Sequence, residues 1–343
     1  MVPRKPPLLG KSPARILLWS IGAAVLLMAA GVAINYSALF YYRAACPAPG
    51  RVYQVDGYSM HLYCVGSGSP TVVLESGVAD NFLSWAKVQH RLSQVTRVCS
   101  YDRAGLGWSE ARPGIRDSNA VAEQLHMLLR KSGMNQPFVL MGHSVAGLHM
   151  RVYRARYPGD IAGIIFVDPS TPGQFAAFLP EGPEYTQREL ADATREKWKA
   201  TVGLTRVLGK CGAVQAGFET WADWLKASDS ECDPALYTTA EREMTAFELS
   251  GKEAAATGPL GDLPILIISS DPDVWGTDWG AFPEALRKRW APAWTSLHED
   301  LGQLSTRNRR VIAKGSHHYV QKDRPELVIE ETERFIRELR GSA

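Results

Sequence analysis

The 343-residue sequence has no strong excess of charge of either sign: 38 Lys and Arg stand against 36 Asp and Glu, for a net charge of +2. It also has no basic run interleaved with aromatic residues, so we do not expect it to bind nucleic acid. Cysteine is scarce, and no Cys-x-x-Cys pair or Cys/His cluster gives the spacing of a metal site. We expect neither a metal nor another cofactor.

The five cysteines are an odd number. In an oxidising compartment, the pairs nearest in sequence are Cys46 with Cys64 and Cys211 with Cys232, which leaves Cys99 on a segment that reads as a buried strand. Because connectivity does not follow from sequence alone, these pairs are expectations.

One long apolar run is present near the N-terminus. No charged residue occurs from Ile16 to Ile34, and about 19 apolar residues are enough for a helix to cross a ~30 Å hydrocarbon core. Residues 1–15 carry four positive charges, which predicts a cytoplasmic tail, a signal anchor over 16–34 and an exported remainder. The alternative is a signal peptide cleaved near Gly31-Val32-Ala33, after which the protein is secreted. Both interpretations export the main domain.

Beyond a predicted linker over residues 35–50, segments typical of strands alternate with segments typical of helices. Strands are expected at 51–55, 60–64, 71–75, 97–101, 138–141, 163–167, 264–268 and 309–313, and helices at 119–131, 146–156 and 325–340. Buried-type strands in this alternation predict an α/β fold with a mostly parallel sheet flanked by helices. The core is assigned to 51–170 and 262–343, and residues 171–261 to an inserted helical cap.

The most informative motif is Gly142-His143-Ser144-Val145-Ala146-Gly147, directly after the apolar run 138–141. A strand followed by a tight turn, a serine and a helix is typical of a nucleophile elbow. The usual pattern Gly-x-Ser-x-Gly is broken by one methyl group, at Ala146. A serine hydroxyl needs a base to take its proton and donors to stabilise the developing oxyanion.

Three further segments complete a resemblance to the α/β-hydrolase superfamily, in its serine branch of proline iminopeptidase-like, epoxide hydrolase-like and esterase-like members. They are 74–78 (Leu-Glu-Ser-Gly-Val), 100–109 (Ser-Tyr-Asp-Arg-Ala-Gly-Leu-Gly-Trp-Ser) and 316–321 (Ser-His-His-Tyr-Val-Gln). The resemblance covers residues 50–340. It implies a Ser-Asp-His order of catalytic residues along the chain.

The resemblance implies that Ser144 is the nucleophile, Asp273 the acid and His318 the base. Asp271 and Asp168, which follow predicted strands, are the alternative acids, and His317 is the alternative base. The backbone N–H groups of Val78 and Val145 would form the oxyanion hole. Asp102 and Arg103 are interpreted as a structural turn, and His143 as packed inside the elbow.

Serine at the elbow argues for acyl transfer through an acyl-enzyme and against epoxide or haloalkane chemistry, which uses an aspartate there. We expect a membrane-anchored carboxylic-ester hydrolase acting on a small, apolar acyl substrate in a pocket of the cap. The aromatic residues of the cap line this pocket or form the cap's own core; they are Trp198, Phe218, Trp221, Trp224, Tyr237 and Phe247. An aminopeptidase or amidase, a C–C hydrolase and an acyltransferase remain alternatives, as does a non-catalytic binding protein with the same fold. Nothing in the sequence bears on oligomeric state.

Overall fold

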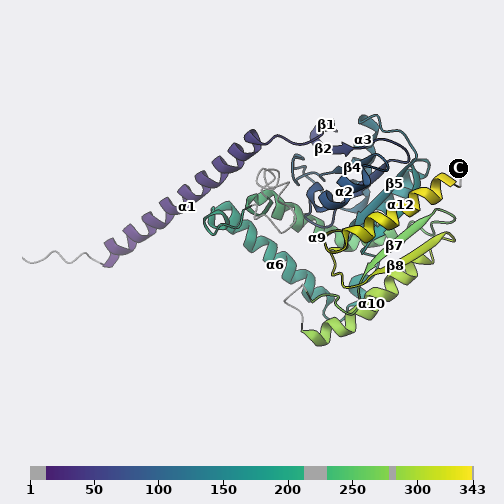
Figure 1. Ribbon diagram of the computed structural model, residues 1–343. Helices are drawn as coiled ribbons and strands as arrows, with labels where there is room; N and C mark the ends of the chain where they lie inside the picture. Colours follow the sequence, from purple (N-terminus) through teal and green to yellow (C-terminus); the bar gives the residue numbers. More distant parts are fainter. Residues whose placement is uncertain (1–12, 212–229, 278–282, 342–343) are drawn as a thin grey trace, which may run out of the picture.

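The computed structural model describes residues 13–211, 230–277 and 283–341 (Figure 1). These residues form an eight-stranded sheet in the order β1-β2-β4-β3-β5-β6-β7-β8. The first two pairings, β1 with β2 and β2 with β4, are antiparallel, and the remaining pairings are parallel. The strands are β1 (Arg51–Val55), β2 (Tyr58–Val65), β3 (Val72–Glu75), β4 (Val98–Tyr101), β5 (Phe138–His143), β6 (Ile161–Val167), β7 (Ile265–Ser270) and β8 (Asn308–Ala313).

Helices cover both faces of the sheet because its strands are apolar on both sides. On β3, for example, Val73 belongs to one buried cluster and Val72 to the other. The first cluster includes residues of α3 (Ser118–Lys131) and α4 (Ala146–Arg156). The second includes residues of α2 (Ala86–Leu92), α11 (Val320–Asp323) and α12 (Pro325–Gly341). The predicted mostly parallel α/β sheet is confirmed.

A group of helices lies between β6 and β7, where the cap was expected over residues 171–261. They are α5 (Gln174–Ala177), α6 (Gly182–Thr201), α7 (Leu204–Val207), the 3-10 turn η4 (Ser230–Cys232) and α9 (Pro234–Ala255). α9 packs against α6 on one side and against α3 and α4 on the other, so it joins the cap to the core. A further helix, α10 (Glu284–Gly302), lies between β7 and β8. The predicted cap aromatics Phe218, Trp221 and Trp224 lie outside the described residues.

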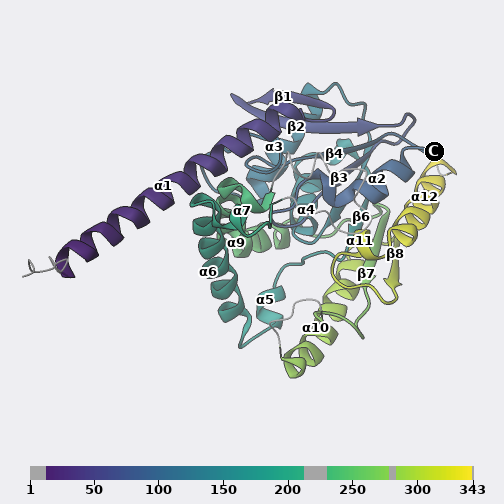
Figure 2. The same cartoon turned by 60° about the vertical axis from the view of Figure 1, so that its left-hand side comes forward.

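The N-terminal helix α1 (Pro13–Ala45) is longer than the predicted anchor. It is the one helix of the described chain that is long and apolar enough to cross a membrane. Residues 35–45 were expected to be a linker but are helical, because this part of α1 docks on the cap. The Asn35 amide is buried and donates to the carbonyl oxygens of Ala200 and Cys232, both at 2.9 Å. Beyond the docked part, α1 projects away from the domain (Figures 1 and 2).

The disulfides correct one expected pairing. Cys211 bonds to Cys232 as predicted, but Cys64 bonds to Cys99, and Cys46 is in neither disulfide. Cys64 on β2 and Cys99 on β4 face each other directly across an antiparallel pair, with their Cα atoms 4.0 Å apart. This sheet register, which proximity in sequence does not reveal, decides the pairing.

Candidate active site

Ser144 lies between the end of β5 and the start of α4, in the left-handed conformation with φ of 57°. A non-glycine residue holds this conformation only when its surroundings enforce it. Here the Ser144 N–H donates to the Val167 carbonyl at 3.2 Å, and the Ser144 carbonyl accepts from the Ser170 N–H at 2.8 Å. The turn is therefore held against the end of β6.

Close packing around the turn explains its small residues. A Cβ atom added at Gly142 would lie 2.6 Å from the Cβ of Ala146, and one at Gly147 would lie 2.6 Å from the Ser170 carbonyl oxygen. Both distances are shorter than any real contact, so these two positions require glycine. Ala146, which breaks the usual motif, is fully buried, and its methyl occupies the space that Gly142 leaves open.

The two predicted oxyanion donors flank this serine. Val145 follows Ser144 directly and is the N-cap of α4. Val78 follows Gly77, whose loop approaches the elbow so closely that an added Cβ at Gly77 would lie 3.3 Å from the Cβ of Ser144. Within the described residues, neither the Val78 nor the Val145 N–H donates to a protein acceptor. Two backbone donors thus remain available beside the serine.

His318 and Asp168 meet at the same edge of the sheet. His318 follows β8, Asp168 directly follows β6, and the Nδ1–H of His318 donates to Asp168 Oδ2 at 2.7 Å. The other carboxylate oxygen of Asp168 accepts from the Ser270 N–H at 2.8 Å and from Trp294 Nε1–H at 3.0 Å. Burial by itself would raise the pKa of Asp168, but the hydrogen bond and charge of His318, together with further donors, lower it to about 2. Asp168 is therefore a buried, ionised carboxylate.

The structure corrects the expected acid, because Asp273 does not reach His318. The Asp273 side chain is 82% exposed and lies 3.5 Å from the Lys314 ammonium. Asp271 turns away as well: its carboxylate accepts from the Gly315 N–H at 2.8 Å and the Asp273 N–H at 3.1 Å, and so shapes the turn after β7. Of the three aspartates considered from sequence, Asp168 is the one that contacts His318.

The neighbouring histidines have separate environments. His317, the alternative base, is partly exposed and contacts Asp323 at 3.2 Å. His143 is buried in the elbow, where its Nε2–H donates to the backbone carbonyl of His318 at 3.0 Å. Burial lowers the pKa of His143 well below its usual value, which keeps the ring neutral. His143 thus holds the backbone of the His318 loop.

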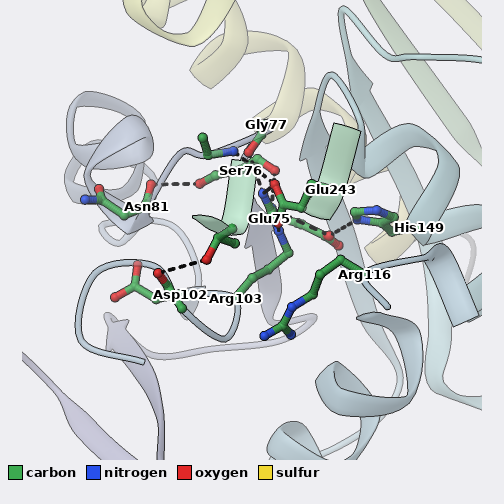
Figure 3. A network of polar contacts seen from close by, with 12 residues as sticks. Glu75, Ser76, Gly77, Asn81, Asp102, Arg103, Arg116, His149 and Glu243 are labelled. Atoms are coloured by element: carbon green, nitrogen blue, oxygen red, sulfur yellow. Dashed lines mark hydrogen bonds and ion pairs between the residues drawn. The ribbon is translucent and has the colours of Figure 1, made fainter. Parts of the chain in front are cut away.

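A buried polar network supports the loop that carries Val78 (Figure 3). Arg103 donates to the backbone carbonyls of Ser76 and Gly77, both at 2.6 Å. It also pairs with Glu243 of α9 through two hydrogen bonds, at 2.7 and 3.0 Å, and Glu243 accepts from the Ala79 N–H at 3.0 Å. Arg103 was interpreted as part of a structural turn, and these contacts show that the turn fixes the loop beside Ser144 and ties it to the cap.

Asp102, the neighbour of Arg103, has a different set of partners. Its carboxylate contacts His61 Nδ1 at 2.7 Å and accepts from the N–H groups of Phe82 and Trp108, at 2.8 and 3.1 Å. All of these contacts lie within the core. Asp102 therefore stabilises the turn between β4 and α3, as the sequence suggested.

An aromatic cluster beside His318 takes two of its four rings from α10 and only one from the predicted cap. Phe178, Trp275, Trp290 and Trp294 form it, and the Trp294 ring lies 6.0 Å from the His318 ring between centroids. Two of the predicted cap aromatics lie away from this cluster: Phe247 packs in the main core and also lines a cavity beside α9, and Trp198 is 56% exposed. A signal was present in the sequence, because Trp290, Trp294 and His298 recur every four residues and so share one helix face.

Comparisons with known proteins agree with this architecture. The family model described as alpha/beta hydrolase fold matches residues 70–202. The uncharacterized protein YbdG of Bacillus subtilis is 33% identical over 171 residues, which cover 49% of this chain and 53% of YbdG. A protein of Gibberella zeae named AB hydrolase superfamily protein is 25% identical over 294 residues, covering 79% of this chain and 87% of that one. The chain spans about half the length of YbdG and of the Schizosaccharomyces pombe protein C23C11.06c, of which 47% is covered.

Solved structures share the fold at low identity. A thermophilic esterase from Thermogutta terrifontis has a TM-score of 0.62 and 17% identity, covering 84% of this chain and 99% of that one. Haloalkane dehalogenase DbeA from Bradyrhizobium elkani also has a TM-score of 0.62 at 17% identity, with coverage of 85% and 99%. The chain has the α/β-hydrolase fold, and the family model and the relatives together support its place in the α/β-hydrolase superfamily.

Proposed function

We propose that the protein is a serine hydrolase that cleaves a carboxylic ester through an acyl-enzyme, with Ser144 as nucleophile, His318 as base and Asp168 as acid. The observation that carries this proposal is the buried 2.7 Å contact between His318 and the ionised Asp168, at the sheet edge where the elbow presents Ser144. A carboxylate at Nδ1 leaves Nε2 of the neutral ring as the atom that accepts a proton.

The roles follow from these positions. Nε2 of His318 takes the hydroxyl proton of Ser144 as its oxygen attacks the ester carbonyl, and then gives that proton to the leaving alcohol. Asp168 holds the ring in the required tautomer and stabilises the imidazolium. The N–H groups of Val78 and Val145 stabilise the oxyanion. Water then attacks the acyl-enzyme with the same histidine as base, and free acid and Ser144 are restored.

An apolar substrate is supported by two features of the domain. The buried cluster of Phe178, Trp275, Trp290 and Trp294 makes the interior next to His318 apolar. An open cavity of about 360 Å³ lies between residues 171–183 and α9 and is lined by Phe175, Leu179 and Phe247 among others. Both favour an acyl or alcohol group of hydrocarbon character.

We further propose that α1 anchors the enzyme in a membrane, with residues 1–15 in the cytoplasm and the catalytic domain exported. The exposed apolar run 16–34 supports an anchor. The two disulfides support an oxidising compartment for the domain, because such bonds persist outside the cytosol.

A fluorophosphonate probe tests the nucleophile on the full-length protein in detergent. We expect wild type to be labelled and Ser144→Ala not to be labelled. Ser170→Ala is the matched control, since Ser170 is a neighbouring buried serine that bonds to the elbow only through its backbone N–H. Equal labelling of wild type and Ser144→Ala would overturn the assignment.

The reaction is tested with p-nitrophenyl esters of graded acyl length beside the matching anilides. We expect ester turnover that rises with acyl length and no anilide turnover. Faster cleavage of anilides would show an amidase or aminopeptidase instead. A labelled protein that turns over neither class would contradict ester hydrolysis while leaving the nucleophile intact.

A further inference from the structure

We propose that an apolar patch on the cap, made of Trp198, Leu204, Val207 and Leu208, lies in the lipid surface beside α1. The inference rests on the proposed anchor and goes beyond it: the cap, and not only the anchor, would touch the bilayer. The partner is a phospholipid membrane, identified by the continuity of the patch with the apolar helix and by the charge around it.

Close packing joins α1 to the patch. A side chain at Gly31 would collide with the carbonyl oxygen of Val202, and one at Gly203 would collide with the carbonyl oxygen of Gly31. Gly31 is therefore the point at which the backbone between α6 and α7 approaches α1. One turn further along α1, Asn35 binds the cap through Ala200 and accepts from Arg206 Nε at 2.9 Å. These contacts fix the position of α7 along α1.

The register along α1 sets the depth of the patch. Gly31 lies three residues before the end of the predicted span 16–34, after which comes the polar Asn35, and this corresponds to about 4–5 Å at ~1.5 Å per residue. The contact therefore lies where hydrocarbon meets headgroups. Apolar helices that lie in this zone bury their faces about 5–10 Å deep. α7 therefore lies at the depth where its apolar face would enter the membrane interface.

The chemistry of the patch fits that zone. Val207 is 76% exposed, Leu208 57% and Trp198 56%, although each is apolar. From Trp198 to Cys211 the sequence contains no acidic residue but has three basic residues, Lys199, Arg206 and Lys210, of which Lys199 is paired with Glu196 at 2.7 Å. Tryptophan and basic side chains around exposed aliphatic residues are typical of an interface with anionic lipids. In water the same apolar surface would remain exposed, which is unfavourable.

The test places an environment-sensitive fluorophore on single cysteines of the full-length protein, in a Cys46→Ser background that keeps both disulfides. Val207→Cys reports on the patch. Leu26→Cys, at a site 72% exposed on α1, reports on the anchor, and Ile312→Cys, at an exposed site on β8, is the control. The protein is reconstituted in vesicles of phosphatidylcholine and phosphatidylglycerol, with and without a lipid that carries a nitroxide on its acyl chain.

We expect the labels at Val207 and Leu26 to shift to shorter emission wavelengths and to lose intensity with the nitroxide lipid, while the label at Ile312 does neither. If the label at Leu26 is quenched but the label at Val207 is not, the lipid patch is overturned and the anchor is retained. The absence of quenching at Leu26 would contradict the anchor itself. In that case quenching at Val207 would show that the cap binds lipid without it.

Discussion

Asp168 and Asp273 follow neighbouring parallel strands, β6 and β7, yet their environments are opposite. Asp168 is fully buried, and its carboxylate accepts three hydrogen bonds, from His318, Ser270 and Trp294. The Asp273 carboxylate is 82% exposed and lies 3.5 Å from the ammonium of Lys314, which is itself 65% exposed. A position at the carboxyl end of a strand is therefore not enough to make an aspartate part of a site.

Asp168 differs from Asp273 because it is buried and because several hydrogen-bond donors converge on its carboxylate. A buried carboxylate remains ionised only when donors replace its water, and those donors also fix its orientation. An exposed ion pair is screened by water and orients its members weakly. Each substitution below removes one carboxylate charge, and we expect the effect to follow the burial and hydrogen bonding of that carboxylate.

The largest effect is expected from Asp168→Asn. The amide keeps the size of the side chain but favours the wrong tautomer of His318, so kcat should fall about 10⁴-fold. The measurement is kcat for an ester substrate, with the far-ultraviolet circular dichroism spectrum as the check of folding. A folded variant with kcat within tenfold of wild type would show that Asp168 is not the acid.

A smaller effect is expected from Glu243→Gln, which changes a buried carboxylate in the cap. Burial by itself would raise the pKa of Glu243, but Arg103 holds it below its usual value, so the native pair is charged. Weakening the Arg103–Glu243 pair should loosen the loop that carries Val78. Because the loss of one oxyanion donor lowers kcat by about 10²–10³-fold, we expect a loosened donor to lower kcat about 10–100-fold with KM nearly unchanged.

The matched control for Glu243 is Glu284→Gln at the start of α10, at a side chain 68% exposed and paired with Lys288. It should behave as wild type. If Glu243→Gln lowered the unfolding temperature while leaving kcat of the folded protein intact, Glu243 would be structural and not a positioning residue for the oxyanion loop.

Asp271→Asn should act on stability rather than on catalysis. Its carboxylate accepts from two backbone N–H groups in the turn after β7, and losing the charge-assisted bonds should lower the free energy of unfolding by about 1–3 kcal/mol. Urea unfolding measures this change. A large loss of kcat in the folded variant would mean that this turn, and not the end of β6, supplies the acid.

The smallest effect is expected from Asp273→Asn. We expect kcat to remain within about twofold of wild type and the free energy of unfolding to remain within about 0.5 kcal/mol, since the lost pair with Lys314 is exposed. Steady-state kinetics with the same ester provides the comparison with Asp168→Asn. A loss approaching that of Asp168→Asn would contradict the assignment of the acid.

Much of the architecture could be predicted from local pattern. The strands at 51–55 and 138–141 and the helix at 146–156 were predicted within two residues at each end, because buried strands and amphipathic helices have distinct periodicities. The turn at Ser144 was also visible, since its steric demands require glycine at fixed positions nearby. α10 was not predicted, and its aromatic residues were missed as part of the site.

By itself, the sequence determined the α/β class, the apolar span, the elbow serine and the histidine loop, because each depends on residues close together in the chain. Only the tertiary structure decided which aspartate faces His318, which cysteine pairs with Cys64, and that Arg103 and Glu243 meet across 140 positions. These contacts depend on strand register and on how the cap packs on the core. Neither is encoded in any short segment, since both arise from the burial of surfaces that are distant in sequence.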